Sequence, residues 1–467
     1  MTPDTTTIKA HWWMAETPNQ QLQGEITYGS TSGAEVDVFG HFYDAFDDTR
    51  RIKRFTLNGL TFNATRISLF DCIIPTATMH LPGAGSCRVS SVSGVVGGHY
   101  RTLEEILFKE VHVRYMGLRE WVWTSGIAVK PEDPPGRLSV SYQVPNSIPL
   151  GDFASFSARI EFTGNVRPDF NTLQITEDCS LVLEAQQMQP YLVFLKYITA
   201  FQRFLCLAVQ QRVYPVEIIG RIDQPKQIVN DQPIFEDYLI IRKASIEGWS
   251  RDKLIPDDQL FTVHELNASP AEVFKRFVER QDRLQSSMDL YFSTIYNRTH
   301  LPRVEFLTLA QSLEAYHRAT MSGKYMDDET YHAGLRQKLW DAIPLPPEID
   351  ASFRASLDKK LEYLHEFSLR KRLKELIKKR AVVIEPLIGN AEDFSTMVSE
   401  SRNRLTHPGD GKTLPDEDYR KLWQLSEKMA LLIEVCFLDE IGFAQHRVKE
   451  MILKRSQRAR RVYRGWV

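Results

Sequence analysis

The chain has 467 residues, of which 43% are hydrophobic and 25% are charged, and its formal net charge at pH 7 is −2. These proportions are ordinary for folded globular proteins, and the length suits two or three domains that each bury a core. A charge so close to neutral excludes a nucleic-acid binder that is basic throughout, so any RNA site must be a local patch.

Apolar and polar residues alternate in several short stretches of the first half. Such alternation predicts strands with one buried face, and it occurs at Ile106/Phe108, Val111/Val113/Tyr115, Trp121/Trp123, Leu138/Val140/Tyr142/Val144 and Phe156/Ala158/Ile160/Phe162. Turn-forming residues separate the stretches, among them Gly29-Ser30, Asn58-Gly59 and Gly97-Gly98. Many short strands at this spacing predict an antiparallel sandwich or barrel.

One helix is expected within this β-rich part. Pro190 suits the start of a helix over residues 191–211, and strands are predicted near 214–220 and 237–243, so the helix should pack on the sheet. The run Tyr191 to Val209 is the most apolar in the chain. Polar residues interrupt it, which favours a buried helix over a membrane span.

A change of composition marks the predicted domain boundary. Ile255-Pro256-Asp257-Asp258 is polar and turn-rich, and Ser269-Pro270-Ala271-Glu272 has the residues of a helix N-cap and capping box. We therefore predict a β-rich domain over residues 1–255, a linker over 256–268, and a helical domain over 269–467.

The second half has helical periodicity throughout. Helices are predicted near 270–297, 302–322, 351–380 (with a break at Ser368), 392–406, 416–441 and 443–460. The predicted fold class is therefore α+β. An antiparallel β-rich domain with a packed helix comes first, and an all-α bundle follows.

The most informative motif is Arg402-Asn403-Arg404-Leu405-Thr406-His407-Pro408, at the end of a predicted amphipathic helix. Asn403 and His407 are four residues apart and so are neighbours on one helix face. Pro408 disfavours continuation of the helix and leaves the imidazole at its end. A guanidinium can hold a phosphate and an imidazole can move a proton near neutral pH, which is the chemistry of a metal-free ribonuclease.

This motif resembles the active-site motif of HEPN ribonucleases. The surrounding helices are most similar to the C-terminal HEPN domain of ApeA-type bacterial anti-phage proteins, in which a β-rich domain also comes first. The run Phe306 to Arg318 resembles an early HEPN helix. The resemblance covers the last two hundred residues with fair specificity. It covers the N-terminal part only loosely, through domain order and β character.

The resemblance implies a metal-independent endoribonuclease. Arg402 and His407 take its catalytic positions, and Asn403 takes the polar position after the arginine. It further implies a homodimer through the helical domain and abortive infection by cleavage of host RNA, with tRNA as the expected target. The β-rich domain is then the candidate for restraint or for sensing a phage-derived trigger.

Two basic stretches are candidates for RNA contact in a chain that is acidic overall. The first supplies the predicted RNA-binding residues Lys371, Arg372, Lys378, Lys379 and Arg380. The second runs from Arg447 to Arg464. Glu314 is a candidate supporting residue near the catalytic helix, although an intrahelical ion pair with Arg318 also explains it.

Two other functions stay open. A catalytically silent HEPN domain would serve as a dimerisation or RNA-binding scaffold. A more remote alternative is a carbohydrate-binding or carbohydrate-active protein that uses the tryptophans of the first half as an aromatic face, although they are expected to be core residues. No pair of carboxylates stands out to support the latter.

The cysteines and histidines predict no metal site and no cofactor. The five cysteines are scattered, at positions 72, 87, 179, 206 and 436, and the histidines of the first half have no mutual ligand spacing. We expect reduced thiols in a cytoplasmic protein that does not enter a membrane, because the first residues also have no basic-then-apolar signal.

Overall fold

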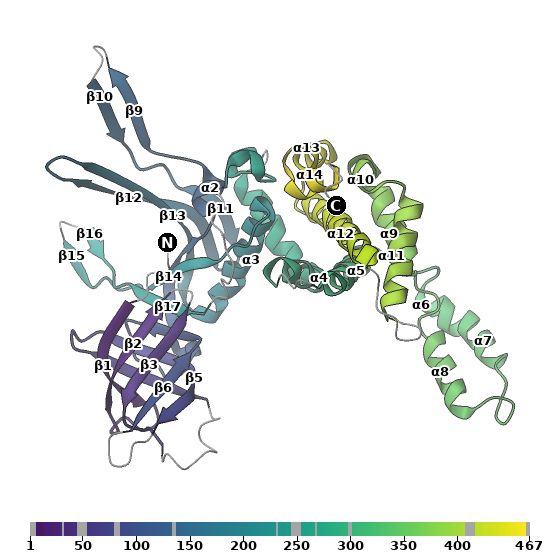
Figure 1. Ribbon diagram of the computed structural model, residues 1–467, viewed down its shortest axis with the longest axis horizontal. Helices are drawn as coiled ribbons and strands as arrows, with labels where there is room; N and C mark the ends of the chain where they lie inside the picture. The colour runs from purple at the N-terminus through teal and green to yellow at the C-terminus, as the bar shows by residue number, and fades with distance from the viewer. Residues whose placement is uncertain are drawn as a thin grey trace. The chain divides into compact units, whose positions relative to one another are not determined.

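The computed structural model describes residues 6–29, 32–43, 54–78, 85–132, 137–229, 232–243, 254–266, 269–297, 301–406 and 416–463 (Figure 1). The chain forms two compact units, Met1–Val278 and Glu279–Val467. The first is built on an antiparallel sheet and the second is helical. The predicted α+β class is confirmed.

The first unit holds a sheet of thirteen strands in the order β11-β12-β13-β8-β14-β17-β7-β5-β4-β1-β2-β3-β6, with a further pairing between β5 and β6. That pairing closes six strands into a barrel. They are β1 (Thr6–Met14), β2 (Leu22–Gly29), β3 (Gly33–Phe39), β4 (Phe55–Thr61), β5 (Arg66–Thr78) and β6 (Ser86–Ser91). Strand β5 can serve both neighbours because its first half pairs with β4 and its second half with β6.

Alternate residues of the barrel strands fill its interior. Trp12, Ile26 and Val36 are fully buried there, as period-two patterning requires. Asn58-Gly59, predicted as a turn, instead lies within β4, opposite Trp12 on β1. A Cβ at Gly59 would come within 2.3 Å of the Trp12 ring. Gly59 therefore makes room for an indole rather than a turn.

The remaining strands of the large sheet continue from the barrel. They are β7 (Ser93–Val96), β8 (Leu107–Tyr115), β11 (Ile148–Phe153), β12 (Phe156–Pro168), β13 (Leu173–Pro190), β14 (Pro215–Arg221) and β17 (Tyr238–Arg242). Two separate hairpins are β9 (Ile127–Glu132) with β10 (Arg137–Tyr142), and β15 (Gln227–Val229) with β16 (Gln232–Ile234). Strands near 214–220 and 237–243 were expected from the sequence pattern and are present as β14 and β17.

Helix α3 (Tyr191–Val209) packs on this sheet, as predicted. Phe194 lies edge-on to Phe156 of β12 with ring centroids 4.9 Å apart, and Tyr115 of β8 donates a hydrogen bond of 2.8 Å to the Ile198 carbonyl. Among the described helices α3 is the one long and apolar enough to cross a membrane, but 56% of that stretch is buried inside the protein. Its apolar side chains thus form core contacts.

The prediction of a strand at Trp121/Trp123 is wrong, because these residues flank the end of helix α2 (Leu118–Val122). Trp121 is buried and its Nε1–H donates to the Phe261 carbonyl at 3.1 Å, whereas Trp123 has a left-handed backbone and is 56% exposed. Two alternating residues do not distinguish a strand from a short helix with one buried face.

The segment predicted as a linker packs closely in its described part. Short 3₁₀ turns occupy Pro256–Asp258 and Val263–Glu265, while Leu260 and Phe261 between them are fully buried. The two units instead divide between Val278 and Glu279, within helix α4 (Pro270–Tyr296). A polar, turn-rich composition does not reveal that two apolar side chains within it belong to a core.

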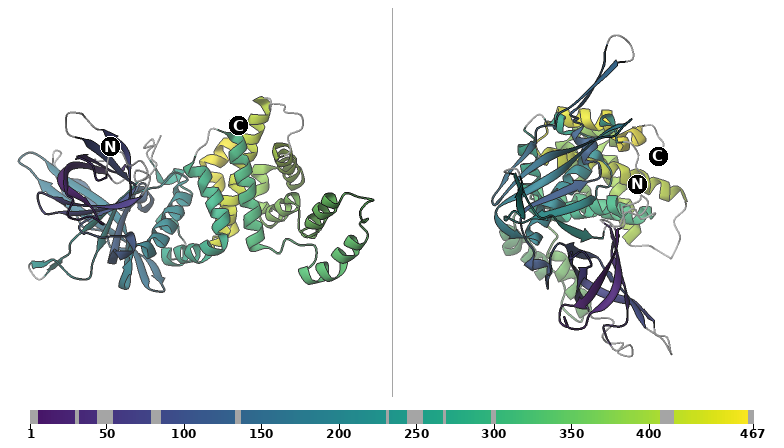
Figure 2. Two further views of the ribbon diagram at one scale, coloured as in Figure 1. Left: turned by 90° about the horizontal axis from the view of Figure 1, so that it is seen from below. Right: turned by 90° about the vertical axis from the view of Figure 1, so that its left-hand side faces the viewer.

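The second unit consists of helices. Their bounds are α5 (Pro302–Thr320), α6 (Asp328–Thr330), the π-helix η4 (Tyr331–Arg336), α7 (Gln337–Asp341), α8 (Ala351–Leu361), α9 (Leu369–Lys379), α10 (Ala381–Ile388), α11 (Ala391–Thr406), α12 (Asp416–Glu440), α13 (Gln445–Arg455) and α14 (Gln457–Tyr463). Helix α12, the long yellow helix of Figure 2, lies against α5, α10, α13 and α14, and α11 lies against α9.

Most of these helices match the predicted ranges. The predicted helix 351–380 is broken before α9, whose N-cap is Ser368, and the predicted helix 443–460 is broken at Ser456. Helix α10 and the segment from α6 to α7 were not predicted. Helix α10 has Pro386 inside it, and α6 and α7 are too short for helical periodicity to emerge.

Candidate functional site

The end of helix α11 carries the described part of the predicted catalytic motif. Phe394, Val398 and Ser401 are buried on one face of α11, whereas Arg402 and Asn403 are exposed. The predicted catalytic His407, and Pro408 after it, lie outside the described residues. Two of the three predicted catalytic residues therefore lie together on an exposed surface at the end of the helix.

Arg402 and its neighbour Arg404 have different surroundings. Within the described residues, the Arg402 guanidinium has one side-chain contact, 3.5 Å from Nη1 to Asn403 Oδ1, and no ion pair. Arg404 is instead paired with Asp418 of α12 at 3.1 Å. Exposure and the long contact leave the donors of Arg402 available to an anion such as a phosphate.

Helix α9 carries the predicted RNA-binding residues, but much of its positive charge is already neutralised. Arg370 and Lys374 both form ion pairs with Glu392, in the first turn of α11. Arg372 and Arg380 are each only 1% exposed. The prediction that these two arginines contact RNA is wrong as far as the described surface is concerned, because a phosphate cannot reach a buried guanidinium.

Arg372 is held by three internal partners. Its Nε–H donates to the Phe367 carbonyl at 2.9 Å, its Nη2 lies 3.0 Å from Glu366 Oε2, and its Nη1 lies 3.1 Å from His317 Nδ1. A guanidinium can only donate, so Nδ1 of His317 accepts and its proton is on Nε2, 2.8 Å from Glu375 Oε2. Burial, reinforced by the charge of Arg372, lowers the pKa of His317 despite the opposing effect of Glu375.

Arg380 forms a second buried ion pair, which connects the end of α9 to helix α12. Its guanidinium lies 2.6 Å from Asp439 Oδ2, and its Nη2 donates to the Tyr316 hydroxyl at 2.9 Å. That hydroxyl donates in turn to Glu440 Oε1 at 3.0 Å. Burial raises the pKa of Tyr316 above its ordinary value, so the phenol is neutral and can donate to the carboxylate.

Three of the five predicted RNA-binding residues remain at the surface. Lys378 and Lys379 are exposed. The Lys371 ammonium lies over the rings of Tyr325 and Phe367, at 3.8 and 3.7 Å from their centroids. The predicted patch is therefore reduced to three lysines, one of which makes cation–π contacts.

The C-terminal basic stretch is also used internally. Arg458 contacts Glu427 at 2.9 Å and Glu434 at 3.1 Å, and Arg461 contacts Glu427 at 2.8 Å. Burial raises the pKa of Glu434, whose Oε1 also accepts from the Tyr291 hydroxyl at 2.8 Å. These ion pairs fasten α14 to α12.

Glu314 has the intrahelical contact that its spacing allows. Its Oε1 accepts from Arg318 Nη2 at 3.1 Å, and Arg318 also contacts Glu366 Oε2 at 2.5 Å. These contacts fasten α5 to the segment before α9. In the described residues they do not extend to Arg402, so the supporting role of Glu314 remains a prediction.

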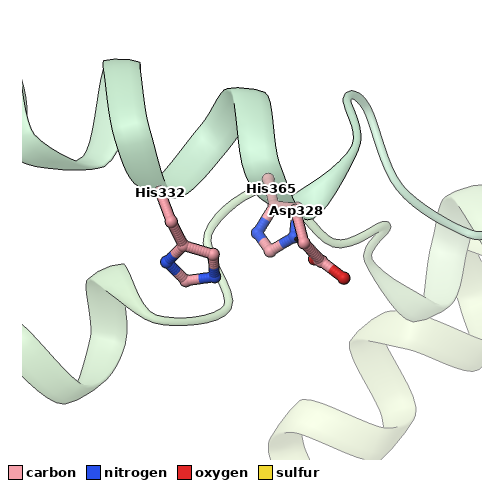
Figure 3. A group of neighbouring side chains, drawn as sticks. All are labelled: Asp328, His332 and His365. Atoms are coloured by element: carbon pink, nitrogen blue, oxygen red, sulfur yellow. Dashed lines mark hydrogen bonds and ion pairs between the residues drawn. The ribbon is translucent and has the colours of Figure 1, made fainter.

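A cluster of metal-ligand residues was missed at the sequence level. Asp328, His332 and His365 each offer one ligand atom, and these atoms lie within 4.8 Å of one another (Figure 3). The four-residue spacing of Asp328 and His332 was a usable signal, whereas His365 comes from a distant part of the sequence. The prediction of no metal site considered the cysteines and the histidines of the first half, and this group of the second half was not considered.

The tryptophans of the first half are mostly core residues, as expected. Trp12 and Trp121 are fully buried, and Trp13 is half-buried with its ring edge-on to His99. Trp123 is the exposed exception. Among the described residues, a single exposed indole gives no support to a face of tryptophans that would bind carbohydrate.

Comparisons with known proteins agree with this architecture. A family model described as ApeA N-terminal domain 1 matches residues 7–277, and one described as Apea-like HEPN matches residues 307–447. The second match contains Arg402, His407 and most of α5 to α13. Neither the curated proteins nor the solved structures yield a match.

Proposed function

The chain belongs to the family of ApeA-type proteins with a C-terminal HEPN domain, and from this premise we propose that it is a metal-independent endoribonuclease. The family relation supports an anti-phage effector of the HEPN type, a domain family generally composed of ribonucleases. Within the proposal, the substrate is host RNA, with tRNA as the target class, and cleavage in the cytoplasm aborts infection. The main observation in favour of this proposal is the exposed guanidinium of Arg402, at the end of a helix in the HEPN segment.

The proposed chemistry is transfer of a phosphate to the neighbouring 2′-hydroxyl. His407 acts as general base and takes the 2′-hydroxyl proton as the 2′-oxygen bonds to phosphorus. It then acts as general acid and delivers a proton to the 5′-oxygen as the bond from phosphorus to that oxygen breaks. Arg402 holds the phosphate and stabilises the charge that develops on its oxygens, and Asn403 orients the imidazole or a phosphate oxygen. The products carry a 2′,3′-cyclic phosphate and a 5′-hydroxyl. DNA lacks the 2′-hydroxyl and is not cut.

The spacing of the motif supports a site shared by two chains. Arg402 and His407 are five residues apart, which corresponds to about 140° around an ideal helix. One helix therefore presents the two groups poorly to one phosphate. A homodimer that brings two motif helices together across a two-fold axis would supply complementary residues from each chain. We propose such an isologous dimer through the helical unit.

The β-rich unit is proposed as the regulatory part. An RNA-cutting effector must be silent in a healthy cell, and a second folded unit precedes the HEPN segment. Within the proposal, this unit restrains the nuclease until it meets a phage-derived trigger.

The test is cleavage of total tRNA by the purified full-length protein in EDTA, followed by analysis of the new ends. Arg402→Ala and His407→Ala should each reduce cleavage by about 10²-fold or more. Arg404→Ala is the matched control, because it removes the same charge from the same helix at a residue already paired with Asp418. It should cut like the wild type.

Two results would count against the proposal. Wild-type cleavage by either motif variant would remove that residue from the reaction. Dimerisation and RNA binding without cleavage, even in cells challenged with phage, would favour the silent scaffold. Growth inhibition on overexpression, abolished by His407→Ala and retained by Arg404→Ala, would support the effector role.

A further inference from the structure

Asp328, His332 and His365 form a built cluster in the segment between α5 and α9. Asp328 begins α6, and His332 follows one turn later in η4. His365 comes from the connection between α8 and α9. Figure 3 shows the two imidazole rings and the carboxylate as neighbours. Their ligand atoms all lie within 4.8 Å of one another. We propose that these three residues bind one divalent transition-metal ion of the zinc type.

The cluster is held in place by its surroundings. The Tyr331 ring stacks on the His365 ring with centroids 4.2 Å apart and an interplanar angle of 16°, and the Tyr331 hydroxyl donates to the Leu361 carbonyl. The backbone of His365 accepts from Tyr325 N–H at 2.8 Å. His365 is 5% exposed and its ring is packed against Tyr331, whereas Asp328 is exposed and His332 is half-buried. An ion could therefore enter from the Asp328 side.

The carboxylate of Asp328 already attracts positively charged or proton-donating groups. His365 Nε2 lies 2.7 Å from Asp328 Oδ1, and the Lys324 ammonium lies 2.6 Å from Oδ2. A metal ion bound at Nε2 would replace the hydrogen bond between the imidazole and the carboxylate, and the ring would then carry its proton on Nδ1. The ion would also take over the charge balance that Lys324 supplies. The Lys324 side chain is 33% exposed and can turn to water.

The donor set selects the class of ion. Two imidazole nitrogens and one carboxylate oxygen suit zinc and related transition metals, whereas magnesium and calcium prefer oxygen ligands. Two ligands at about 2.1 Å from a tetrahedral ion are about 3.4 Å apart. The present limit of 4.8 Å therefore requires only a modest closure, which the less buried Asp328 and His332 side chains can make. Water would complete the coordination.

The ion would have a structural role. Its ligands join the start of α6 and η4 to the connection that precedes α9, and so close the loop that contains α7 and α8. Binding at a site that exists only in the folded chain stabilises that fold. None of the three ligands belongs to the motif helix α11, so the ion takes no part in the proposed RNA chemistry.

The experiment is titration of the EDTA-stripped, dialysed full-length protein with Zn²⁺, followed by calorimetry and by the thermal unfolding midpoint. We expect one equivalent of Zn²⁺ to bind and to raise the midpoint by roughly 3–5 °C at saturating metal, whereas Mg²⁺ should not. Co²⁺ in place of Zn²⁺ should give a visible absorption band. These readouts do not depend on nuclease activity, so the metal site and the proposed function can fail separately.

Variants decide the assignment. His332→Ala and Asp328→Asn should each weaken Zn²⁺ binding at least tenfold and abolish the thermal shift. His446→Ala, which removes an exposed histidine elsewhere in the same unit, is the matched control and should bind like the wild type. His365→Ala removes a buried ring and could also destabilise the fold. The half-buried His332 is therefore the better residue for the test. Unchanged Zn²⁺ binding in His332→Ala, or no thermal shift in the wild type, would overturn the proposal.

Discussion

Replacing Arg372 by alanine should destabilise the helical unit rather than remove an RNA contact. The guanidinium is almost fully buried and contacts the Phe367 carbonyl, Glu366 and His317. Its removal leaves the buried Nδ1 of His317 without its donor, and leaves Arg318 as the remaining cation beside the Glu366 carboxylate. Breaking such a buried ionic contact costs about 3–5 kcal/mol, a large part of the roughly 5–15 kcal/mol that stabilises a typical domain.

Lys378→Ala on the same helix is the matched control, since it also removes one positive charge but from an exposed position. It should change stability by no more than about 0.5 kcal/mol. Thermal unfolding followed by circular dichroism at 222 nm should show the contrast. Arg372→Ala should lower the midpoint by roughly 6–20 °C for a unit of this size, and Lys378→Ala should leave it within about 2 °C.

An intermediate variant tests the role of the forked guanidinium. Arg372→Lys keeps the charge but cannot donate to all three partners at once, so it should recover only part of the lost stability. The reasoning would be refuted if Arg372→Ala unfolded at the wild-type temperature while RNA binding fell. In that case the arginine would lie at the surface, and α9 would be a basic face as the sequence alone suggests.

The other predictions concern RNA binding, metal dependence, assembly and pH. Changing Lys371, Lys378 and Lys379 together to alanine should weaken RNA binding and lower its salt dependence by up to about three units, roughly 0.9 for each lysine that contacts a phosphate, with the cleavage step unchanged. An unchanged salt slope would show that RNA binds elsewhere. Cleavage at 25 °C should persist in EDTA, and a loss restored by Mg²⁺ or Mn²⁺ would contradict the metal-free chemistry. Sedimentation should show a homodimer, and dimers of wild-type and His407→Ala chains should show whether one cut needs both subunits. The free energy of unfolding should fall as the pH is lowered from 7.5 to 5.5. The pKa of His317 is lowered in the folded chain, so over this range the unfolded chain binds a proton at His317 and the folded chain does not. A His317→Gln variant should lose that part of the pH dependence, and an equal slope in both proteins would exclude His317 as its cause.

Sequence patterns by themselves determined the class of fold and most of its elements. Period-two and helical spacings are local properties, so they located α3, α5 and α11 within two residues and the first half of β12. The motif from Arg402 to Pro408 is equally local, and it identified the HEPN segment that the family model also matches. The exposed position of Arg402 likewise follows from the buried face of its own helix.

Tertiary structure decided which charged residues face water. Arg372 and Lys371 are adjacent in sequence and equally basic, yet one is buried among side chains from α5 and the connection before α9 while the other lies over two aromatic rings. Nor could local spacing bring His365 to Asp328 and His332, which precede it by more than thirty residues. Burial and ligand geometry depend on which faces of distant elements meet, and this is set by packing across the whole unit rather than by neighbours in the chain.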